Sequence, residues 1–149
     1  MSQTAASMAR MTTSKTNERM KKVYLSGRIS DLTREQYMQM FSIAEDMLKK
    51  KNYKVKNPSR FWISRHYRWL VKLFGEENAY RLTLLYDLWQ LMKCDLIYKL
   101  PSWQQSRGAN IESCVAYHFK VWPMSPEVVK KIDKRLEKLI KKFDGKPTE

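Results

Sequence analysis

The sequence predicts an α/β protein with a parallel sheet of four or five strands. The main observation is an alternation along the chain, in which short apolar runs of strand length take turns with longer segments whose apolar residues recur every three or four positions. Turn-forming residues such as Gly, Asn, Pro and Ser follow several of the short runs. The chain has 149 residues, 43% of them hydrophobic, which is enough for one domain with a core. We therefore expect a single domain over residues 21–149, without internal repeats.

The composition restricts the partner and the compartment. The net charge of +14 favours an anionic partner but does not choose among phosphate, nucleotide, nucleic acid and a membrane surface. No apolar run approaches the roughly 18 residues of a membrane span. The first 20 residues lack the apolar core of a signal peptide, so we expect a disordered extension over residues 1–20 and a cytoplasmic protein. Cys94 and Cys114 lack the ligand spacing of a zinc site, so we expect no metal and two reduced, buried thiols.

The sequence of the first half of the domain predicts two strands with one helix between them. Residues 23–25 form a short apolar strand, and the polar residues 26–30 form the turn after it. A helix is expected over residues 33–50, capped by Asp31 or Thr33. Its apolar face consists of Tyr37, Phe41, Ala44, Met47 and Leu48. A second strand follows over residues 53–55 and is closed by Asn57-Pro58, because proline cannot donate to a strand ladder.

The second half predicts two more strands and four helical segments. Residues 59–93 are expected to be largely helical with a break at Gly75, and Leu82, Leu85, Leu88, Trp89 and Met92 keep helical spacing after that break. Strands are expected over residues 96–98 and 120–122, separated by a helix over residues 109–119. Ser125 is expected to cap a terminal helix whose apolar residues are Val128, Val129, Ile132, Leu136, Leu139, Ile140 and Phe143.

Three polar loops follow the predicted strands, over residues 26–30, 57–60 and 100–108. Ligands of open parallel sheets bind outside the carboxyl ends of the strands, so we expect these loops to meet in a binding site.

Glu112 is the acid that stands out near the third of these loops. We expect it in the first turn of its helix, where an acid complements the helix dipole by about 0.3–1 kcal/mol. Three features weigh against that purely structural interpretation: Gly108 allows close approach of a ligand, the helix start favours an anion, and Ser106 supplies a hydroxyl. A carboxylate in such a place can attack a sugar carbon or stabilise a cation developing there.

Several short motifs together resemble one known family. They are Tyr24-Leu-Ser-Gly27, Lys54-Val-Lys-Asn-Pro58, Cys94-Asp-Leu-Ile-Tyr98, and Trp103-Gln-Gln-Ser-Arg-Gly-Ala-Asn-Ile-Glu112 with Ala116. This pattern resembles the nucleoside 2-deoxyribosyltransferase-like superfamily and, more narrowly, its branch catalogued as domain of unknown function 4406. The resemblance covers roughly residues 22–122. It implies a flavodoxin-like (Rossmann-like) three-layer fold and cleavage of N-glycosidic bonds in (deoxy)nucleosides or their monophosphates, with no cofactor.

The resemblance also implies roles for individual residues. Glu112 matches the nucleophile that attacks the anomeric carbon, and Asp87 matches an acid that contacts the base and donates a proton. Ser106 matches a serine that holds a 5′-phosphate, with Gly108 beside it. Tyr24 and Gly27 match residues that line the sugar pocket. Where the family commonly has proline, this chain has Arg28, which can bind phosphate through two hydrogen bonds.

Some of these residues also have a purely structural explanation, and other titratable residues have to be weighed against them. Asp87 is as well explained as a solvated helix residue, and Asp95 is a second acid for which its place at a strand start favours a structural role. His66 and His118 are more typical of packed or surface residues than of catalytic bases. Tyr24 is also explained by packing alone.

A basic span separates the acids Asp46 and Glu76. It contains Lys49, Lys50, Lys51, Lys54, Lys56, Arg60, Arg65, Arg68 and Lys72, interleaved with aromatic residues. We expect most of the aromatics, such as Trp62, Trp69 and Phe74, to be core and the lysines to be solvated. Asn57 and Arg60 fall on the ligand edge, and Arg60 is the best candidate in this span for a phosphate contact. Other interpretations are nucleic-acid binding through residues 49–72, a lid, or a contact between subunits of a homo-oligomer.

Two functions follow from these observations. The first is an N-glycosidase or deoxyribosyltransferase with Glu112 as nucleophile. The alternative is a nucleotide or nucleic-acid binding module that keeps the fold without turnover. Cleavage of a nicotinamide dinucleotide is a third possibility that no residue of the chain favours.

Overall fold

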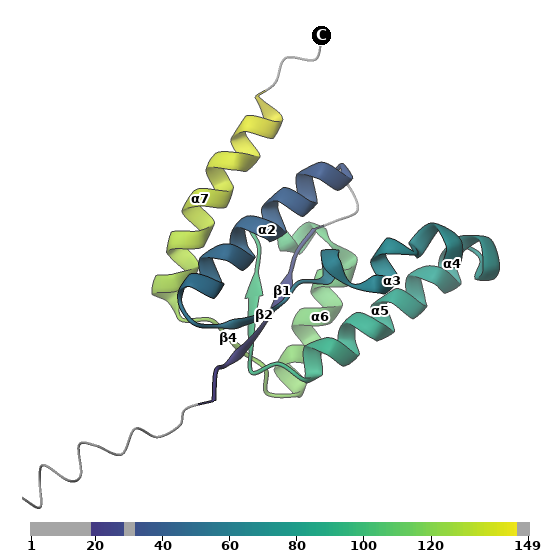
Figure 1. The fold of residues 1–149 in the computed structure, drawn as a ribbon, viewed down its shortest axis with the longest axis horizontal. Helices are drawn as coiled ribbons and strands as arrows, with labels where there is room; N and C mark the ends of the chain where they lie inside the picture. Colours follow the sequence, from purple (N-terminus) through teal and green to yellow (C-terminus); the bar gives the residue numbers. More distant parts are fainter. Residues whose placement is uncertain (1–18, 29–31, 146–149) are drawn as a thin grey trace, which may run out of the picture.

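The computed structural model describes residues 19–28 and 32–145, and Figure 1 shows the fold. The strands are β1 (Lys22–Ser26), β2 (Lys54–Lys56), β3 (Leu96–Lys99) and β4 (Trp122–Pro123). The helices are α2 (Arg34–Lys50), α3 (Trp62–Arg65), α4 (Tyr67–Phe74), α5 (Glu76–Met92), α6 (Arg107–His118) and α7 (Pro126–Asp144), with 3-10 turns η1 (Pro58–Arg60) and η2 (Trp103–Gln105). The expected extension over residues 1–20 lies almost entirely outside the described residues, and so do the second half of the turn over 26–30 and the candidate cap Asp31.

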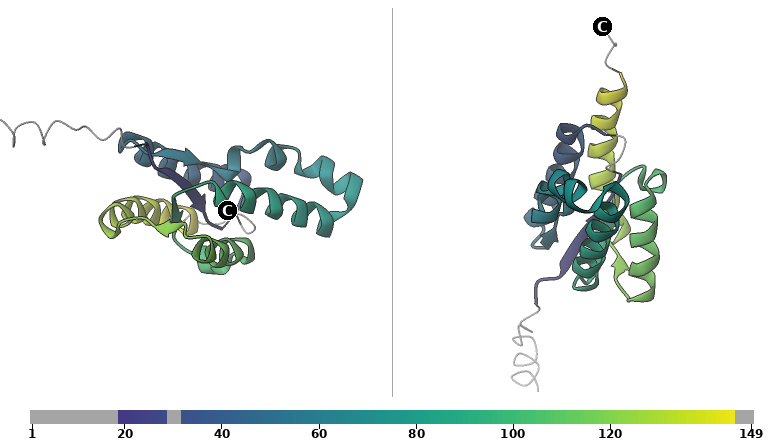
Figure 2. Two further views of the ribbon diagram at one scale, coloured as in Figure 1. Left: turned by 90° about the horizontal axis from the view of Figure 1, so that it is seen from below. Right: turned by 90° about the vertical axis from the view of Figure 1, so that its right-hand side faces the viewer.

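The four strands form one parallel sheet in the order β2-β1-β3-β4. Two helices, α2 and α7, cover one face, while α5 and α6 cover the other, as Figures 1 and 2 show. This arrangement confirms the predicted flavodoxin-like, three-layer α/β fold with a parallel sheet. The chain passes from β1 to β2 on one side of β1 and then crosses to β3 on the other side. The switch point of the sheet therefore lies between β1 and β3.

Each face of the sheet buries its own core. Val23 and Leu25 of β1 pack with Tyr98 of β3 against α2 and α7, whereas Tyr24 and Ile97 face α5 and α6. This alternation follows from the two-residue period of a strand. The predicted apolar faces of the helices over 33–50 and after Ser125 are confirmed, because both pack into the first of these cores.

The ends of the elements are set by local chemistry. Thr33 caps α2, since its hydroxyl accepts from the Gln36 amide and the Gln36 side chain accepts from the Thr33 amide. Gly75 separates α4 from α5 with a φ of 82°, a conformation that other residues rarely adopt. The fourth strand was expected over residues 120–122, but β4 spans Trp122–Pro123 and so includes the proline. The Trp122 amide donates to the Asp95 carbonyl just before β3, and the Met124 amide donates to the Ile97 carbonyl in β3, so the missing N–H of Pro123 faces away from the sheet.

The expectation that the aromatics after Arg60 are core is wrong for most of them. Trp62, Trp69 and Phe74 are exposed, although Leu70 of the same segment is buried. The reason is that α4 and α5 pair with each other as a hairpin that projects beyond the sheet (Figures 1 and 2). A projecting hairpin has only one helix to pack on, so it buries less of its apolar surface.

Two further expectations concern small parts of the fold. Cys94 is buried, but Cys114 on α6 is exposed, so the expected burial of both thiols is wrong for Cys114. Asp95 confirms its expected structural role, because it accepts hydrogen bonds from the Lys22 amide and the Arg19 side chain at the start of the sheet. None of the helices in the described part of the chain is long and apolar enough to cross a bilayer.

Candidate functional site

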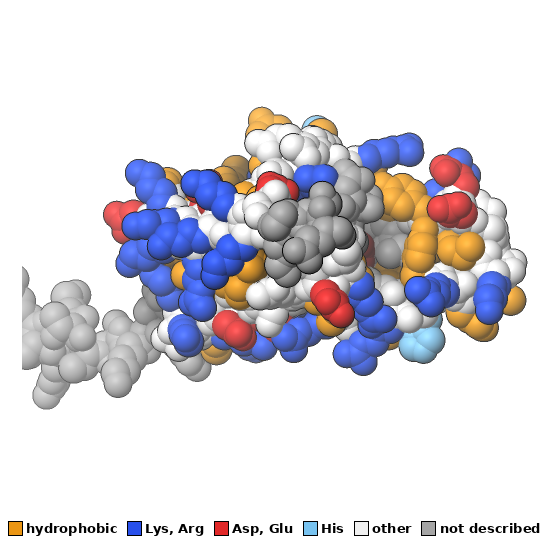
Figure 3. Space-filling model, turned by 90° about the horizontal axis from the view of Figure 1, so that it is seen from above, with side chains coloured by type: hydrophobic (Ala, Val, Ile, Leu, Met, Phe, Trp, Pro, Cys, Tyr) orange, Lys and Arg blue, Asp and Glu red, His pale blue; other side chains and the backbone are white. Residues whose placement is uncertain are grey.

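A cavity of about 710 Å³ opens at the carboxyl end of β1. Figure 3 looks onto this side of the molecule. The walls come from the end of β1, from α2, η1, α3, α4 and α5, and from the start of α6. The polar residues of the wall are Tyr37, Ser59, Ser64, Tyr67, Glu76, Glu77, Tyr80, Thr83, Asp87, Ser106, Arg107 and Glu112. Five predicted site residues are brought together here. They are Gly27, Asp87, Ser106, Gly108 and Glu112, and all of them contribute to one cavity.

Gly27 lies at the switch point, where the chain after β3 comes close to the end of β1. A Cβ on Gly27 would lie 3.0 Å from the Cβ of Leu100, which is too close without a shift of the chain. Glycine therefore lets the two loops meet at the floor of the cavity.

Ser106 sets the start of α6. Its hydroxyl accepts a hydrogen bond from the Ala109 amide at 3.2 Å, and its carbonyl accepts one from the Asn110 side chain at 2.7 Å. Gly108 presents no side chain to the cavity, where a Cβ would lie 3.6 Å from the Tyr80 hydroxyl. The Ser106 hydroxyl keeps its own hydrogen for a ligand, because in the cap it acts as the acceptor.

We expected Glu112 in the first turn of its helix, but it lies in the second turn. The reason is that α6 begins at Arg107 and not at Ala109. Its side chain is buried, and Oε2 has no hydrogen-bond partner within the described residues. Burial and the nearby charge of Asp87 raise the pKa of Glu112 to about 8. The Tyr24 and Ser26 hydroxyls lie close enough to lower this pKa somewhat, although neither makes a well-formed hydrogen bond to the carboxyl. A helix-end charge would sit in solvent, so this burial does not fit the structural interpretation.

Asp87 comes from α5 and faces the same cavity. Its Oδ1 is buried and has no hydrogen-bond partner among residues 19–28 and 32–145. Burial raises the pKa of Asp87 to about 7. The interpretation of Asp87 as a solvated helix residue is therefore wrong. The cavity holds two carboxyls that take up a proton far more readily than free carboxyls do.

Tyr24 lies behind Glu112 rather than in the cavity wall. It is fully buried, and burial together with the Glu112 and Asp87 charges raises the pKa of its phenol well above the usual value. Ser26 is buried beside Glu112 too, and the sequence analysis did not single it out. Its signal was its place as the last residue of β1, since side chains at strand ends meet the ligand edge.

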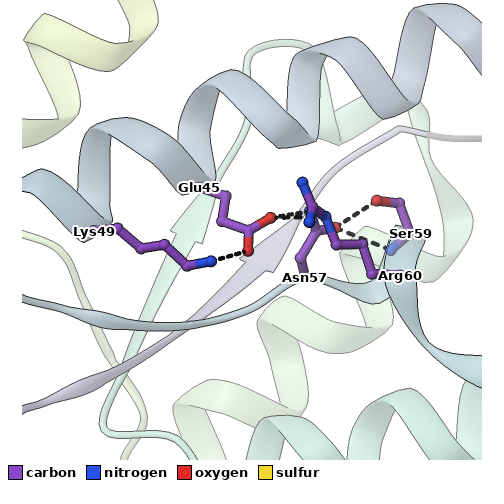
Figure 4. Close-up of polar contacts among 5 residues, drawn as sticks. All are labelled: Glu45, Lys49, Asn57, Ser59 and Arg60. Carbon is purple, nitrogen blue, oxygen red and sulfur yellow. Dashed lines mark hydrogen bonds and ion pairs between the residues drawn. The ribbon is translucent and has the colours of Figure 1, made fainter.

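Asn57 and Arg60 belong to a different cluster, which Figure 4 shows. The Asn57 amide donates to Glu45 at 2.8 Å, and its oxygen accepts from the Ser59 amide and hydroxyl at 3.0 and 2.6 Å. Arg60 and Lys49 pair with the two oxygens of Glu45 at 3.1 and 2.7 Å. Neither Asn57 nor Arg60 is among the cavity-lining residues, so their predicted contact with substrate finds no support in this geometry. Asn57 instead positions Ser59, which does line the cavity.

Arg28 and the other basic residues predicted to contact a ligand lie outside the described cavity wall. Arg28 is half-buried and is not in the described part of the cavity wall. Most of the basic span is exposed on the surface, namely Lys50, Lys51, Lys54, Arg65, Arg68 and Lys72. Among the described residues of the cavity wall, four carry a carboxyl and one carries a guanidinium, that of Arg107, which lies 5.9 Å from the centre of the Tyr80 ring. The described residues hold no cluster of three or more His, Cys, Asp and Glu side chains arranged to bind a metal.

Residues 59–81 contribute much of the wall that sequence reasoning missed. Ser59, Tyr67, Glu76, Glu77 and Tyr80 all line the cavity. Their sequence spacing carries no motif, because they are brought together only by the turn of the α4–α5 hairpin over the end of β1.

Comparison with protein families places the chain. Residues 21–122 match the family described as "Domain of unknown function (DUF4406)", and the chain belongs to that family. No curated protein and no solved structure matches the chain.

Proposed function

We propose that the protein is an N-glycosidase or deoxyribosyltransferase that acts on a (deoxy)nucleoside or its monophosphate, with Glu112 as the nucleophile. The observation that carries the proposal is a pair of carboxyls that face one cavity at the switch point of the sheet: Glu112 is buried, Asp87 is half-buried, and each has one buried oxygen without a hydrogen-bond partner among the described residues. The likeness of the motifs around Gly27, Ser106 and Glu112 to the nucleoside 2-deoxyribosyltransferase-like superfamily supports it.

The pair suits a double-displacement reaction. The Glu112 carboxylate attacks the anomeric carbon, the bond to the base breaks, and the base nitrogen keeps the electron pair and takes a proton from Asp87. The sugar is then held as an ester of Glu112. In the second step the Asp87 carboxylate accepts a proton from water, or from an incoming base, whose oxygen or nitrogen displaces Glu112 from the sugar.

The charge state of the pair has a consequence for this reaction. With pKa values raised to about 8 and about 7, Glu112 and Asp87 share roughly one proton near neutral pH. The higher pKa of Glu112 places that proton more often on Glu112, whereas the first step needs it on Asp87, so the reactive form is the minor one of the two. Tyr24 and Ser26 support the required form, because hydroxyls beside Glu112 favour its carboxylate.

The cavity wall favours the nucleoside over its monophosphate. Glu76 and Glu77 add two carboxylates to the catalytic pair, and Arg107 is the guanidinium of the described wall. A 5′-phosphate would carry up to two negative charges into this surrounding, where the Ser106 hydroxyl and the start of α6 are the groups that favour it.

The test measures, by chromatography, the release of free base from the deoxynucleosides and from their monophosphates. We expect wild type to release base from at least one of them, and Glu112→Gln to lose about 10³-fold or more. Glu127→Gln, an exposed change on α7, is the matched control and should keep full activity. If wild type and Glu112→Gln behave alike on every substrate, the proposed reaction is wrong.

A second candidate function rests on the basic surface. Arg65, Arg68 and Lys72 are exposed beside Trp69, and exposed aromatics with basic neighbours bind single-stranded nucleic acid. Binding of labelled single strands should then weaken steeply with salt and be lost in Trp69→Ala together with Arg68→Ala. No binding at low salt excludes this function without touching the first.

A further inference from the structure

The outer side of α5 carries an apolar surface that nothing in the described structure covers. Between Arg81 and Lys93 the exposed residues of this helix are Leu82, Leu85, Trp89 and Met92, and their exposed fractions are 40%, 63%, 52% and 40%. We call these four residues the α5 stripe. For a chain with 30% charged residues, an exposed helix side of about three turns without a charge needs an explanation.

The spacing of the α5 stripe identifies the kind of partner. Its residues follow each other at intervals of three, four and three positions, which is the seven-residue repeat of a seam between two paired helices. A sheet or a flat membrane surface makes no use of so narrow a row. A partner helix with the same repeat is required, and a second copy of the chain supplies one.

The structure leaves this side of α5 free for such a contact. The residues of α5 that line the cavity, including Tyr80, Thr83 and Asp87, lie on the opposite side of the helix, since successive residues turn by about 100°. A partner on the α5 stripe therefore leaves the cavity open.

The surface is large enough to contribute to a stable contact. Trp62 of α3 is exposed and extends the α5 stripe, because its ring packs edge-on against Tyr86, which in turn packs against Trp89. Together these side chains expose on the order of 500 Å² of apolar surface, more than half of the roughly 800 Å² that one partner buries in a standard interface.

We infer that the α5 stripe is the interface of a homodimer in which two α5 helices pair antiparallel about a two-fold axis. In this arrangement Leu85 of each copy packs against Trp89 of the other, and Leu82 against Met92. Lys93 lies with its amine 3.3 Å from the centre of the Trp89 ring, at the rim of the α5 stripe.

The test is the mass of the full chain in solution by light scattering and sedimentation, over a wide concentration range. Wild type should be a dimer, whereas Leu85→Glu and Met92→Lys should be monomers with unchanged circular dichroism, because both side chains are exposed. Tyr117→Glu is the matched control for Leu85→Glu: it puts the same charge at an exposed apolar side chain outside the α5 stripe and should stay a dimer.

Three outcomes would overturn the inference. They are a monomeric wild type at all concentrations, a dimer that survives Leu85→Glu, and a wild-type monomer that floats with anionic vesicles and loses this in Leu85→Glu. The last result would assign the α5 stripe to a membrane surface. Because the cavity lies on the other side of α5, base release by the Leu85→Glu monomer is a separate readout that does not decide the oligomer.

Discussion

Two buried glutamates of this chain differ in the groups that surround their carboxyls. Glu45 on α2 and Glu112 on α6 are exposed by 4% and 7%. Lys49, Arg60 and Asn57 surround Glu45, as Figure 4 shows. Burial alone would raise the pKa of Glu45, but these partners outweigh it and hold the pKa below the usual value. Glu112 has no such partners, and its pKa is raised to about 8.

The difference separates a carboxylate with compensating partners from one without them. The partners of Glu45 compensate its desolvation and join α2 to η1, so the charge serves the fold. At Glu112 the desolvation is not compensated, which costs stability unless a ligand or a reaction uses it. A buried carboxyl without partners that faces a cavity is therefore the better candidate for chemistry.

The largest expected effect concerns the second carboxyl of the cavity. Asp87→Asn should lower base release by about 10²–10⁴-fold, because the departing base loses its proton donor. Substrates whose base leaves without a proton should recover most of that loss. If Asp87→Asn slows both kinds of substrate equally, Asp87 holds the substrate but is not the acid.

The next effect is on stability and concerns Glu45. Glu45→Ala should lower the free energy of unfolding by about 3 kcal/mol, because it leaves the Asn57 amide without its buried partner and removes two ion pairs. Denaturant unfolding measures it. A change below about 1 kcal/mol would mean that the Glu45 cluster is replaced by water at little cost, and the comparison with Glu112 would lose its basis.

Stability as a function of pH should separate the two glutamates by sign. The raised pKa of Glu112 makes the folded state bind more protons than the unfolded one between pH 4.5 and about 8, so wild type loses stability as pH rises through that window. Glu112→Gln should therefore be more stable than wild type at high pH, by about 2 kcal/mol, and equal to it near pH 4. The lowered pKa of Glu45 means that its contribution is present above pH 4.5 and lost as pH falls below it. Thermal unfolding of Glu112→Gln and Glu45→Gln across pH checks both signs, and a gain of stability by Glu45→Gln at neutral pH contradicts the comparison.

The pH dependence of base release tests the shared proton. Only the pair with one proton has both an ionised nucleophile and a protonated acid, and its population is largest between the two pKa values, about 7 and about 8. We expect a narrow, bell-shaped profile of kcat/KM centred there. A profile that is flat from pH 5 to 9 would show that the two carboxyls do not limit the reaction.

The smallest effect is expected from a single cation of the Glu45 cluster. Arg60→Ala should cost less than about 1 kcal/mol, because the Arg60 side chain is half exposed and Lys49 remains. It should not change the affinity for substrate, since Arg60 does not line the cavity. Weaker binding of a nucleoside monophosphate by this variant, measured by calorimetry, would restore the predicted phosphate contact.

Local patterns were sufficient for most of the fold. The apolar face of α2, the break at Gly75 and the strand before Pro101 each depend on residues close in sequence, so their periods and turn residues identified them. The placement of Trp62, Trp69 and Phe74 was predicted wrongly because it also relied on local patterns alone. A helical apolar face says that something should cover it, and not whether the sheet or another molecule does so.

The candidate site was found in part. Motif likeness selected Glu112, Asp87, Ser106, Gly27 and Gly108, and the structure gathers these five around one cavity. The position of residues 57–60 after the second predicted strand put Asn57 and Arg60 at the ligand edge, but a hydrogen bond and an ion pair draw both to Glu45, twelve and fifteen positions earlier in the chain. No pattern in the sequence shows which of two nearby polar groups a side chain will choose.

By itself, the sequence determined the α/β class and the order of the elements, because these depend on short-range periodicity, and the spacing within one motif singled out Glu112 as a candidate for chemistry. The tertiary structure decided which buried acid is compensated. Glu45 and Glu112 both lie on helices that pack on the sheet, and the helical periodicity around each does not show which of them has charged partners. Compensation depends on which groups from distant segments reach the carboxyl: Asn57 and Arg60 reach Glu45, whereas Asp87 raises the cost of ionising Glu112.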